Sequence, residues 1–170
     1  AINGKWKKGP GKKLTKVIKK ATKGASIIAE DLGVVGDNVR ALIQKTGWPG
    51  MKILLFAFDD ENGANEYLPH NYASENCIVY GGTHDNDTIV GYYKEKSDEE
   101  IKFVKQYLGI SKKEDLPRAM IRCGYASIAK TAVFQMQDIL ALDNSARMNC
   151  PSTVGTNWKW RMLPNQFTAD

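Results

Sequence analysis

The sequence has few cysteines and few histidines. Its three cysteines, Cys77, Cys123 and Cys150, lie far apart and form no CxxC pair, which argues against a disulfide framework and a cysteine-based zinc site. We expect free thiols that are mostly buried. The only two histidines, His70 and His84, are a small supply for a histidine-rich metal site.

Long apolar runs are also absent. No stretch of eighteen or more apolar residues occurs, and residues 1–24 lack the apolar core of a signal peptide. We therefore expect neither a membrane span nor export, and we predict a cytoplasmic protein with no membrane partner. With 170 residues, of which 42% are hydrophobic and 25% charged, the composition is that of one soluble globular domain.

Acidic residues are missing from residues 1–26, which hold nine lysines. The net charge of +5 is therefore local, because the rest of the chain carries a net −4. Apolar residues three and four apart predict an amphipathic helix over residues 12–23 with a solvated lysine face. No aromatic stacking platform is interleaved with the lysines, so we favour this interpretation over a nucleic-acid patch and expect no nucleic-acid partner.

Apolar runs that alternate with helical patterns predict a parallel α/β architecture. Buried strands are expected at residues 25–33, 50–58 and 77–82. Helices are expected at residues 34–47, 97–108 and 117–132, with Ser97 as the N-cap of the second. Residues 132–140 are ambiguous between a strand and a helix.

Polar residues follow two of the predicted strands. Glu30 and Asp31 end the first strand, and His84, Asp85 and Asp87 follow the third. Because the carboxyl ends of parallel strands meet at one edge of a sheet, the two groups can converge on one site. Converging carboxylates are typical of acid/base chemistry, and glycoside transfer depends on such pairs.

Several longer motifs identify a family. The stretches "IIAEDLG", "GWPGMKILLFAFD", "NEYLPHNY", "VYGGTHDNDT" and "MQDILALDNSARMNCPSTVGTNWKWR" follow one another between residues 27 and 161, and the resemblance that they carry runs over residues 1–161. In this order they resemble the C-terminal half of 4-α-glucanotransferase, also called amylomaltase, a glycoside hydrolase of family 77 in the α-amylase clan. The resemblance implies the C-terminal half, about strands five to eight, of a (β/α)₈ barrel, with residues 1–170 as a single piece of it.

The resemblance also implies roles for particular residues. Glu30 matches the general acid, and Asp85 matches the aspartate that stabilises the transition state, with His84 helping. The expected substrates are α-1,4-glucans such as maltooligosaccharides and amylose, and neither a cofactor nor a metal is implied. The further substrate contacts that we predict are Asp31, Phe56, Asn86 and Asn157.

Several of these residues have an equally ordinary structural interpretation. Asp31 can cap a loop, Phe56 fits the core by periodicity, and Asn157 can pack at the end of the barrel. Asp87 and Thr88 are expected to cap the segment that follows them. Two positions depart from the family pattern, because Gly81 stands where threonine is expected and Ser152 replaces a glycine common in its turn.

The family's nucleophilic aspartate has no counterpart in the sequence. It lies in an "R-x-D-H" motif, which these residues do not contain, and no acidic residue precedes Glu30. We therefore expect the chain to be inactive alone. Half a barrel leaves sheet edges unpaired, so we expect it to pair with another copy as a homodimer or to bind the missing N-terminal half.

Two other function classes stay open. A metal-dependent phosphohydrolase would use His84, Asp85 and Asp87 as ligands, although only His70 is left as a further histidine. A non-catalytic glucan-binding or assembly module would keep the aromatic tail, with Trp158 and Trp160, and would not turn substrate over.

Overall fold

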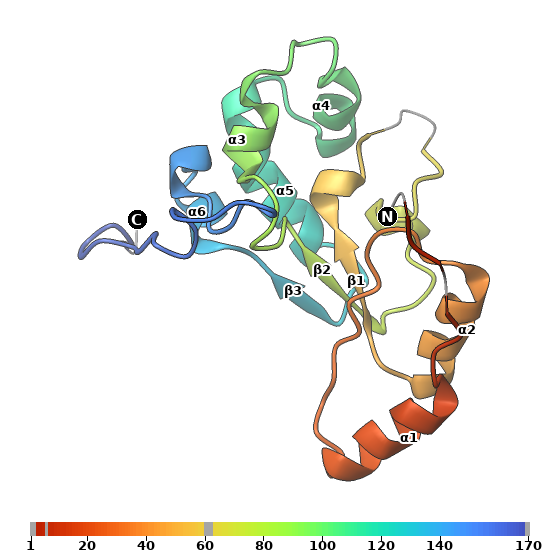
Figure 1. The fold of residues 1–170 in the computed structure, drawn as a ribbon. Helices are drawn as coiled ribbons and strands as arrows, with labels where there is room; N and C mark the ends of the chain where they lie inside the picture. The colour runs from red at the N-terminus through yellow and green to blue at the C-terminus, as the bar shows by residue number, and fades with distance from the viewer. Residues whose placement is uncertain (1–2, 6, 60–62, 169–170) are drawn as a thin grey trace. The chain divides into compact units, whose positions relative to one another are not determined.

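The computed structural model describes residues 3–5, 7–59 and 63–168. The chain divides into two compact units, residues 1–51 and residues 52–170 (Figure 1). The prediction that residues 1–170 form a single piece of one barrel stays a prediction.

The first unit contains two helices, α1 (Lys12–Ala21) and α2 (Asp37–Thr46). Both were expected from the sequence. Helix α2 ends at Gly47, whose φ of 69° is the left-handed conformation that glycine adopts without steric cost. The Lys19 ammonium donates to the carbonyl oxygen of Thr46 and so joins the two helices.

Residues 25–33 do not form the predicted strand. The Ala29 N–H donates to the Pro49 carbonyl at 2.9 Å, as a neighbouring strand would. On the opposite segment, the Met51 N–H does not donate to a backbone carbonyl of residues 25–33, as it would in a paired strand. It donates to the side-chain oxygen Asp31 Oδ1 at 2.8 Å. A side-chain acceptor at this point interrupts the backbone ladder that a strand needs.

The second unit is built on a three-stranded sheet in the order β1 (Gly50–Ile53), β2 (Cys77–Tyr80) and β3 (Thr131–Val133). Strand β1 begins at the boundary between the units. Strands β2 and β3 run parallel, with Ile78 opposite Thr131. The strand predicted over residues 50–58 is shorter than expected, because Leu54–Phe56 turn into a 3-10 helix.

Four helices accompany the sheet: α3 (Ile89–Lys94), α4 (Lys102–Leu108), α5 (Leu116–Tyr125) and α6 (Met136–Ile139). Helix α5 contacts α3, α4 and α6 (Figure 1). Gly124 allows α5 to approach the chain after β3, since a Cβ there would lie 2.5 Å from Phe134 Cζ. Further 3-10 helices occupy Pro69–Asn71, Lys113–Asp115 and Asn144–Ala146.

Two helix predictions need correction at their ends, and the ambiguous stretch is resolved. Helix α4 begins at Lys102 rather than at residue 97, because Ser97 and Glu100 bond to each other in a separate turn. Helix α5 ends at Tyr125, and the ambiguous stretch 132–140 contains both the end of β3 and α6. The intervening turn is stabilised by Ser127, whose hydroxyl donates to the Gly124 carbonyl at 2.7 Å.

The core lies in the second unit and is aliphatic. Its fully buried side chains come from the end of β1, from β2 and from α3, α4 and α5, and they include Ile53, Leu54, Leu55, Val79, Ile89, Val104, Leu116 and Met120. In the described part of the first unit, by contrast, Thr46 alone is classed as buried. Burial of apolar surface is the main favourable term in folding, so the second unit carries most of the stability.

The three cysteines are free thiols, as expected. Cys77 is buried, Cys123 is half-buried and Cys150 is exposed, so the expectation that they are mostly buried holds fully for Cys77 alone. Burial raises the pKa of the Cys123 thiol. Within the described residues, no helix has the length and apolar character needed to cross a membrane.

Asp138 is a buried carboxylate at the start of α6, with 1% of its surface exposed. Its Oδ1 accepts from the Ile89 N–H at 2.7 Å, while Oδ2 has no hydrogen-bond partner among the described residues. Burial raises the pKa of this carboxyl to about 6. A Cβ on Gly81 would lie 3.4 Å from Oδ2, so the absence of a side chain at Gly81 leaves this oxygen without a neighbour that could donate.

The raised pKa of Asp138 predicts that stability falls as pH rises. The folded state holds this proton more tightly than the unfolded state does, so its contribution is fully present below about pH 4 and is lost through about pH 6. We expect Asp138→Asn to flatten this fall and to raise the free energy of unfolding at neutral pH by about 2 kcal/mol. Urea unfolding between about pH 4 and pH 8 measures both effects.

Asp143 provides a control, because its pKa is shifted in the opposite direction to that of Asp138. Hydrogen bonds from Ser145, together with Lys94, lower the pKa of the Asp143 carboxyl to about 2. This contribution is present above the ordinary pKa near 4 and is lost as pH falls. Asp143→Asn should therefore reduce stability at neutral pH and leave the loss through about pH 6 in place; an unchanged pH profile in Asp138→Asn contradicts the assignment.

Ser152 sits in the left-handed backbone region, with a φ of 65°. This conformation explains why a glycine is expected at that turn, since a Cβ is strained there. We expect Ser152→Gly to raise the free energy of unfolding by about 0.5–1 kcal/mol, and Ser152→Ala to leave it nearly unchanged. Chemical denaturation of the three proteins measures this, and an equal effect of the two substitutions would refute the strain.

Candidate active site

Glu30 and Asp31 lie in the first unit, on the segment that precedes α2. Glu30 is exposed and its carboxylate has no hydrogen-bond partner among the described residues. Asp31 is half-buried, and a Cβ on Gly50 would lie 2.4 Å from its Oδ2, so Gly50 is needed to accommodate the carboxylate. The predicted convergence of these acids with Asp85 of the second unit stays a prediction.

The loop after β2 is organised by its own side chains. Asn86 Oδ1 accepts from the Thr83 N–H at 2.8 Å and from the Thr83 hydroxyl at 2.9 Å. Gly82 permits this turn, since a Cβ there would lie 2.9 Å from Leu55 Cδ1. The predicted sugar contact of Asn86 stays a prediction, although its carbonyl oxygen already accepts two hydrogen bonds within the loop.

His84 and Asp85 point to the surface, with 52% and 47% of their side chains exposed. Asp85 Oδ1 accepts from Asn149 Nδ2 at 2.5 Å and lies 3.3 Å from His84 Nε2. Asp85 Oδ2 has no partner among the described residues. The Trp158 ring lies 5.0 Å from the His84 ring, so an accessible carboxylate oxygen, an imidazole and an indole are gathered in one place.

Arg147 fixes this loop from a distant part of the chain. Its guanidinium pairs with the Asp87 carboxylate and donates through Nη2 to the Asp85 carbonyl at 2.7 Å. Its Nε donates to the Asn149 carbonyl at 2.9 Å. The Asn149 N–H in turn donates to the His84 carbonyl at 3.0 Å, so the tail and the loop are joined at several points.

Thr88 caps helix α3, as expected. Its hydroxyl accepts from the Gly91 N–H at 3.0 Å, while its own N–H donates to Asn144 Oδ1 at 3.1 Å. A capped helix start immediately after the loop fixes the direction in which the chain leaves it. Together with the Arg147–Asp87 pair, this agrees with the structural interpretation of Asp87 and Thr88.

Phe56 and Asn157 have structural partners. The Phe56 ring is half-buried and packs edge-to-face on Tyr67, with centroids 5.5 Å apart. Asn157 Oδ1 accepts from the Cys150 N–H at 3.0 Å, and its Nδ2 donates to the Thr153 carbonyl at 3.1 Å. Their predicted substrate contacts stay predictions. Outside this group, His70 is tied to Tyr107 and the Gly63 carbonyl, as expected of a structural loop residue.

Sequence reasoning missed Arg147 and Asn149. Both lie about sixty residues after the loop that they hold, so no local spacing connects them with Asp85 and Asp87. The signal available was the motif "SARMNC", which contains an arginine and an asparagine among small residues. Pairing that arginine with a particular acid needs the fold.

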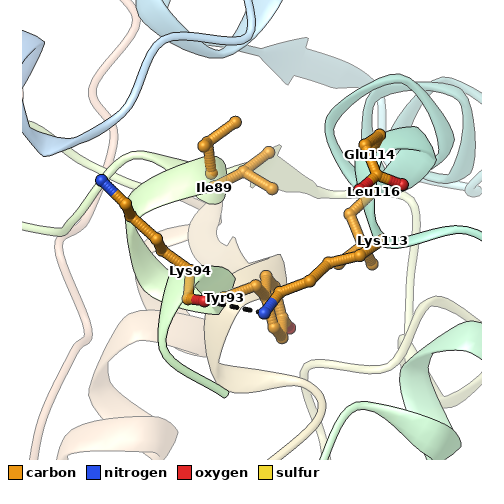
Figure 2. A pocket seen from close by; sticks show the side chains of 7 residues that line it. Ile89, Tyr93, Lys94, Lys113, Glu114 and Leu116 are labelled. Atoms are coloured by element: carbon orange, nitrogen blue, oxygen red, sulfur yellow. Dashed lines mark hydrogen bonds between the residues drawn. The ribbon is translucent and has the colours of Figure 1, made fainter. Parts of the chain in front are cut away.

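A separate pocket of about 200 Å³ lies between α3 and the start of α5 (Figure 2). Its walls are mainly apolar, with Ile89, Tyr93 and Leu116 among them. The two lysines at this pocket already have partners, because Lys113 donates to the carbonyls of residues 94 and 96 and Lys94 pairs with Asp143. None of the predicted site residues lines it.

No group of three histidine, cysteine, aspartate or glutamate side chains among the described residues could hold a metal ion. His84 and Asp85 are adjacent, but Asp87 faces Arg147 instead. The described residues therefore do not gather the three ligands that a metal-dependent phosphohydrolase would need at this loop.

A family model described as 4-alpha-glucanotransferase matches residues 1–166. The chain belongs to the 4-alpha-glucanotransferase family. This agrees with the resemblance seen in the sequence motifs, and it makes the parallel α/β architecture a segment of a larger fold.

Relatives in the family match the whole chain. The 4-alpha-glucanotransferase of Thermus thermophilus is 44% identical over 176 residues, covering 100% of this chain and 35% of the relative. The enzyme of Clostridium butyricum is 46% identical over 171 residues, with the same coverage. The chloroplastic/amyloplastic 4-alpha-glucanotransferase of Solanum tuberosum is 44% identical, covering 100% of this chain and 29% of the relative.

The fold matches a solved structure of the family. Amylomaltase from Streptococcus agalactiae, in complex with acarbose, superposes with a TM-score of 0.90 at 38% identity, over 98% of this chain and 34% of that chain. The chain thus spans about a third of the length of the relatives that it matches. The part that it spans is an α/β segment with a parallel sheet.

The position of Arg147 predicts that the loop depends on it. Arg147→Ala removes the partner of Asp87 and the donor to the Asp85 carbonyl, so we expect a loss of about 1–2 kcal/mol in the free energy of unfolding. Hydrogen exchange measured by mass spectrometry should be about tenfold faster in residues 83–88, and unchanged in α5.

Lys94→Ala is the matched control for this prediction. It removes an exposed ion pair of the same unit, Lys94–Asp143, and should change stability by less than about 0.5 kcal/mol. Equal exchange of residues 83–88 in Arg147→Ala and the parent chain would show that the loop is held by other contacts.

Proposed function

We propose that this chain carries the general acid and the transition-state-stabilising carboxylate of a 4-alpha-glucanotransferase site. The observation that supports this most directly is the loop after β2, where Asp85 is held by Asn149 and still has an accessible oxygen beside His84 and Trp158. An exposed carboxylate on a fixed loop beside an indole ring is suited to a sugar, whose hydroxyls donate to the acid and whose ring packs on the aromatic face.

In the proposed reaction, a segment of an α-1,4-glucan moves to the 4-hydroxyl of another glucan with retention. A carboxylate nucleophile attacks the anomeric carbon while Glu30 gives its proton to the departing glycosidic oxygen, and a covalent glucosyl-enzyme forms. Glu30 then takes a proton from the acceptor's 4-hydroxyl, which attacks the same carbon and releases the nucleophile.

Asp85 has a different task in this proposal. Positive charge develops on the sugar ring as the glycosidic bond breaks, and a fixed carboxylate stabilises that charge and accepts hydrogen bonds from the ring hydroxyls. Asn149 and the loop contacts of Arg147 prevent Asp85 from moving away from the ring. His84 contacts a hydroxyl, and Asp31, Phe56, Asn86 and Asn157 are proposed as further contacts with the glucan.

The nucleophile is proposed to come from outside these residues. No "R-x-D-H" sequence occurs in the 170 residues, and Glu30 has no acidic residue before it. A general acid without a nucleophile cannot form the covalent intermediate. We therefore propose that the chain acts together with the other part of a barrel, or pairs with a second copy, and has no transferase activity alone.

A maltotriose disproportionation assay tests this proposal in two stages. The 170-residue chain alone should release no glucose. A chimaera, in which residues 1–170 replace the matching segment of the Thermus thermophilus relative, should release glucose and longer maltodextrins. In the chimaera, Glu30→Gln and Asp85→Asn should each lower kcat by about a thousandfold.

Asp31→Asn and Asp87→Asn serve as matched controls in the chimaera. Each removes one carboxylate next to a proposed catalytic one, and each should lower kcat much less than its neighbour does. Glucose release by the isolated chain that Glu30→Gln abolishes would overturn the proposed lack of activity. An active chimaera in which Glu30→Gln or Asp85→Asn has full activity would overturn the assigned roles.

A glucan-binding module without turnover is the second candidate. The Trp158–His84 ring pair beside Asp85 favours it, since these residues would be available to contact sugar whether or not a reaction follows. The acarbose bound in the Streptococcus agalactiae amylomaltase supplies the probe. Saturable acarbose binding by the chain, weakened by Trp158→Ala, together with an inactive chimaera, would favour the module over the enzyme.

A further inference from the structure

Four lysines line one concave surface of the first unit. A pocket of about 890 Å³ is formed by the loop before α1, by the start of α1 and by α2. Its charged side chains are Lys7, Lys8, Lys12 and Lys45. These lysines come from three separate segments, and only Lys12 belongs to the solvated helix face that periodicity predicts over residues 12–23.

None of the described residues that line the pocket is acidic. Asp37, in the first turn of α2, lies next to two of them in sequence. Residues 1–51 contain eleven lysines and arginines and three acids, a net charge of +8. The ammonium groups of the four pocket lysines have no hydrogen-bond or ion-pair partner among the described residues. Lys19 differs from them, because it donates to the Thr46 carbonyl.

A smaller pocket of about 330 Å³ extends the basic surface along α1 and α2. It shares Lys12 and Lys45 with the larger pocket and adds Lys16 and Lys19. Ammonium groups that line the same pocket repel one another, so binding an anion between them relieves this repulsion.

The backbone adds donors at the same place. Gly36 precedes α2 and lines the larger pocket, and no side chain caps this helix start. The Val39 N–H already donates to Asn38 Oδ1 and to the Gly36 carbonyl, whereas the N–H groups of Asp37 and Asn38 have no partner among the described residues. These two groups and the dipole of a ten-residue helix favour an anion there. Gly9 and Gly11 also line the pocket, and a Cβ on either would meet no atom within 4 Å, so the wall is open at these residues.

We propose that this pocket binds a small organic diphosphate or bisphosphate. A phosphate monoester carries a charge of about −1.5 to −2, so two phosphate groups match the four ammonium groups. The volume is that of a small-molecule site. Among the described residues that line the pocket none is aromatic, so these residues offer no surface on which nucleic-acid bases could stack.

This inference is independent of the proposed transferase activity. Glucans are uncharged, Asp85 and its partners belong to the second unit, and Glu30 and Asp31, which share the first unit with the lysine pocket, do not line it. Binding of the diphosphate can therefore be measured on the 170-residue chain whether or not that chain transfers glucan.

Isothermal titration calorimetry of the 170-residue chain, with inorganic pyrophosphate as the probe, tests the proposal. We expect saturable binding with one site, tighter than that of orthophosphate. The double variant Lys12→Gln/Lys45→Gln should weaken it by about tenfold or more, because it removes two charge-assisted contacts. The substitution Lys12→Arg/Lys45→Arg keeps both charges and should retain most of the binding.

Lys13→Gln/Lys20→Gln is the matched control. Both residues lie on α1 but line neither pocket, so this variant lowers the net charge equally and should keep pyrophosphate affinity within about twofold. Circular dichroism checks that all variants keep their helices. Absent pyrophosphate saturation, or equal weakening by the two Gln pairs, overturns the proposal. The proposal is also overturned if the chain binds single-stranded oligothymidylate more tightly than pyrophosphate and this affinity falls equally in the two double Lys→Gln variants.

Discussion

Arg147 holds the loop after β2 at two points, the Asp87 carboxylate and the Asp85 carbonyl. Because one planar guanidinium makes both contacts, the position of Asp87 and the direction of Asp85 are set together. Asn149 then takes Asp85 Oδ1, and Trp158 packs on His84. The geometry on which a sugar would be recognised therefore depends on a side chain that never needs to touch sugar.

The sequence predicts this molecule best where the determinants are local. Helix α2 is recognisable because it begins near Asp37 and ends at Gly47, and β2 because it is a short apolar run before two glycines. The segment at residues 25–33 looks the same by pattern but lacks a ladder, since Asp31 takes the Met51 amide. That contact joins residues twenty positions apart, and apolar periodicity carries no information about it.

The candidate site shows the same difference between features set by local sequence and features set by long-range contacts. The motif "THDND" predicts a site in the loop after β2, and Thr88 caps α3 as expected. The motif could not reveal that the two aspartates have different surroundings. Asp85 is accessible, whereas Asp87 is paired with Arg147 from the tail. The lysines of the first unit are a second example of a feature that local pattern does not predict. Periodicity describes one face of α1, and it cannot show that the preceding loop and α2 form a pocket together with the start of that helix.

The distance in sequence between the loop and Arg147 also has a consequence for synthesis of the protein. The loop leaves the ribosome sixty residues before the arginine that fixes it. At typical elongation rates this interval lasts about 3–12 s. For most of that time β2 has no β3 to pair with, and throughout it His84, Asp85 and Asp87 have neither Asn149 nor Trp158 beside them. The nascent chain thus exposes a bare strand edge and an unsecured loop for seconds, which makes this stretch a natural place for a chaperone to bind or a protease to cut.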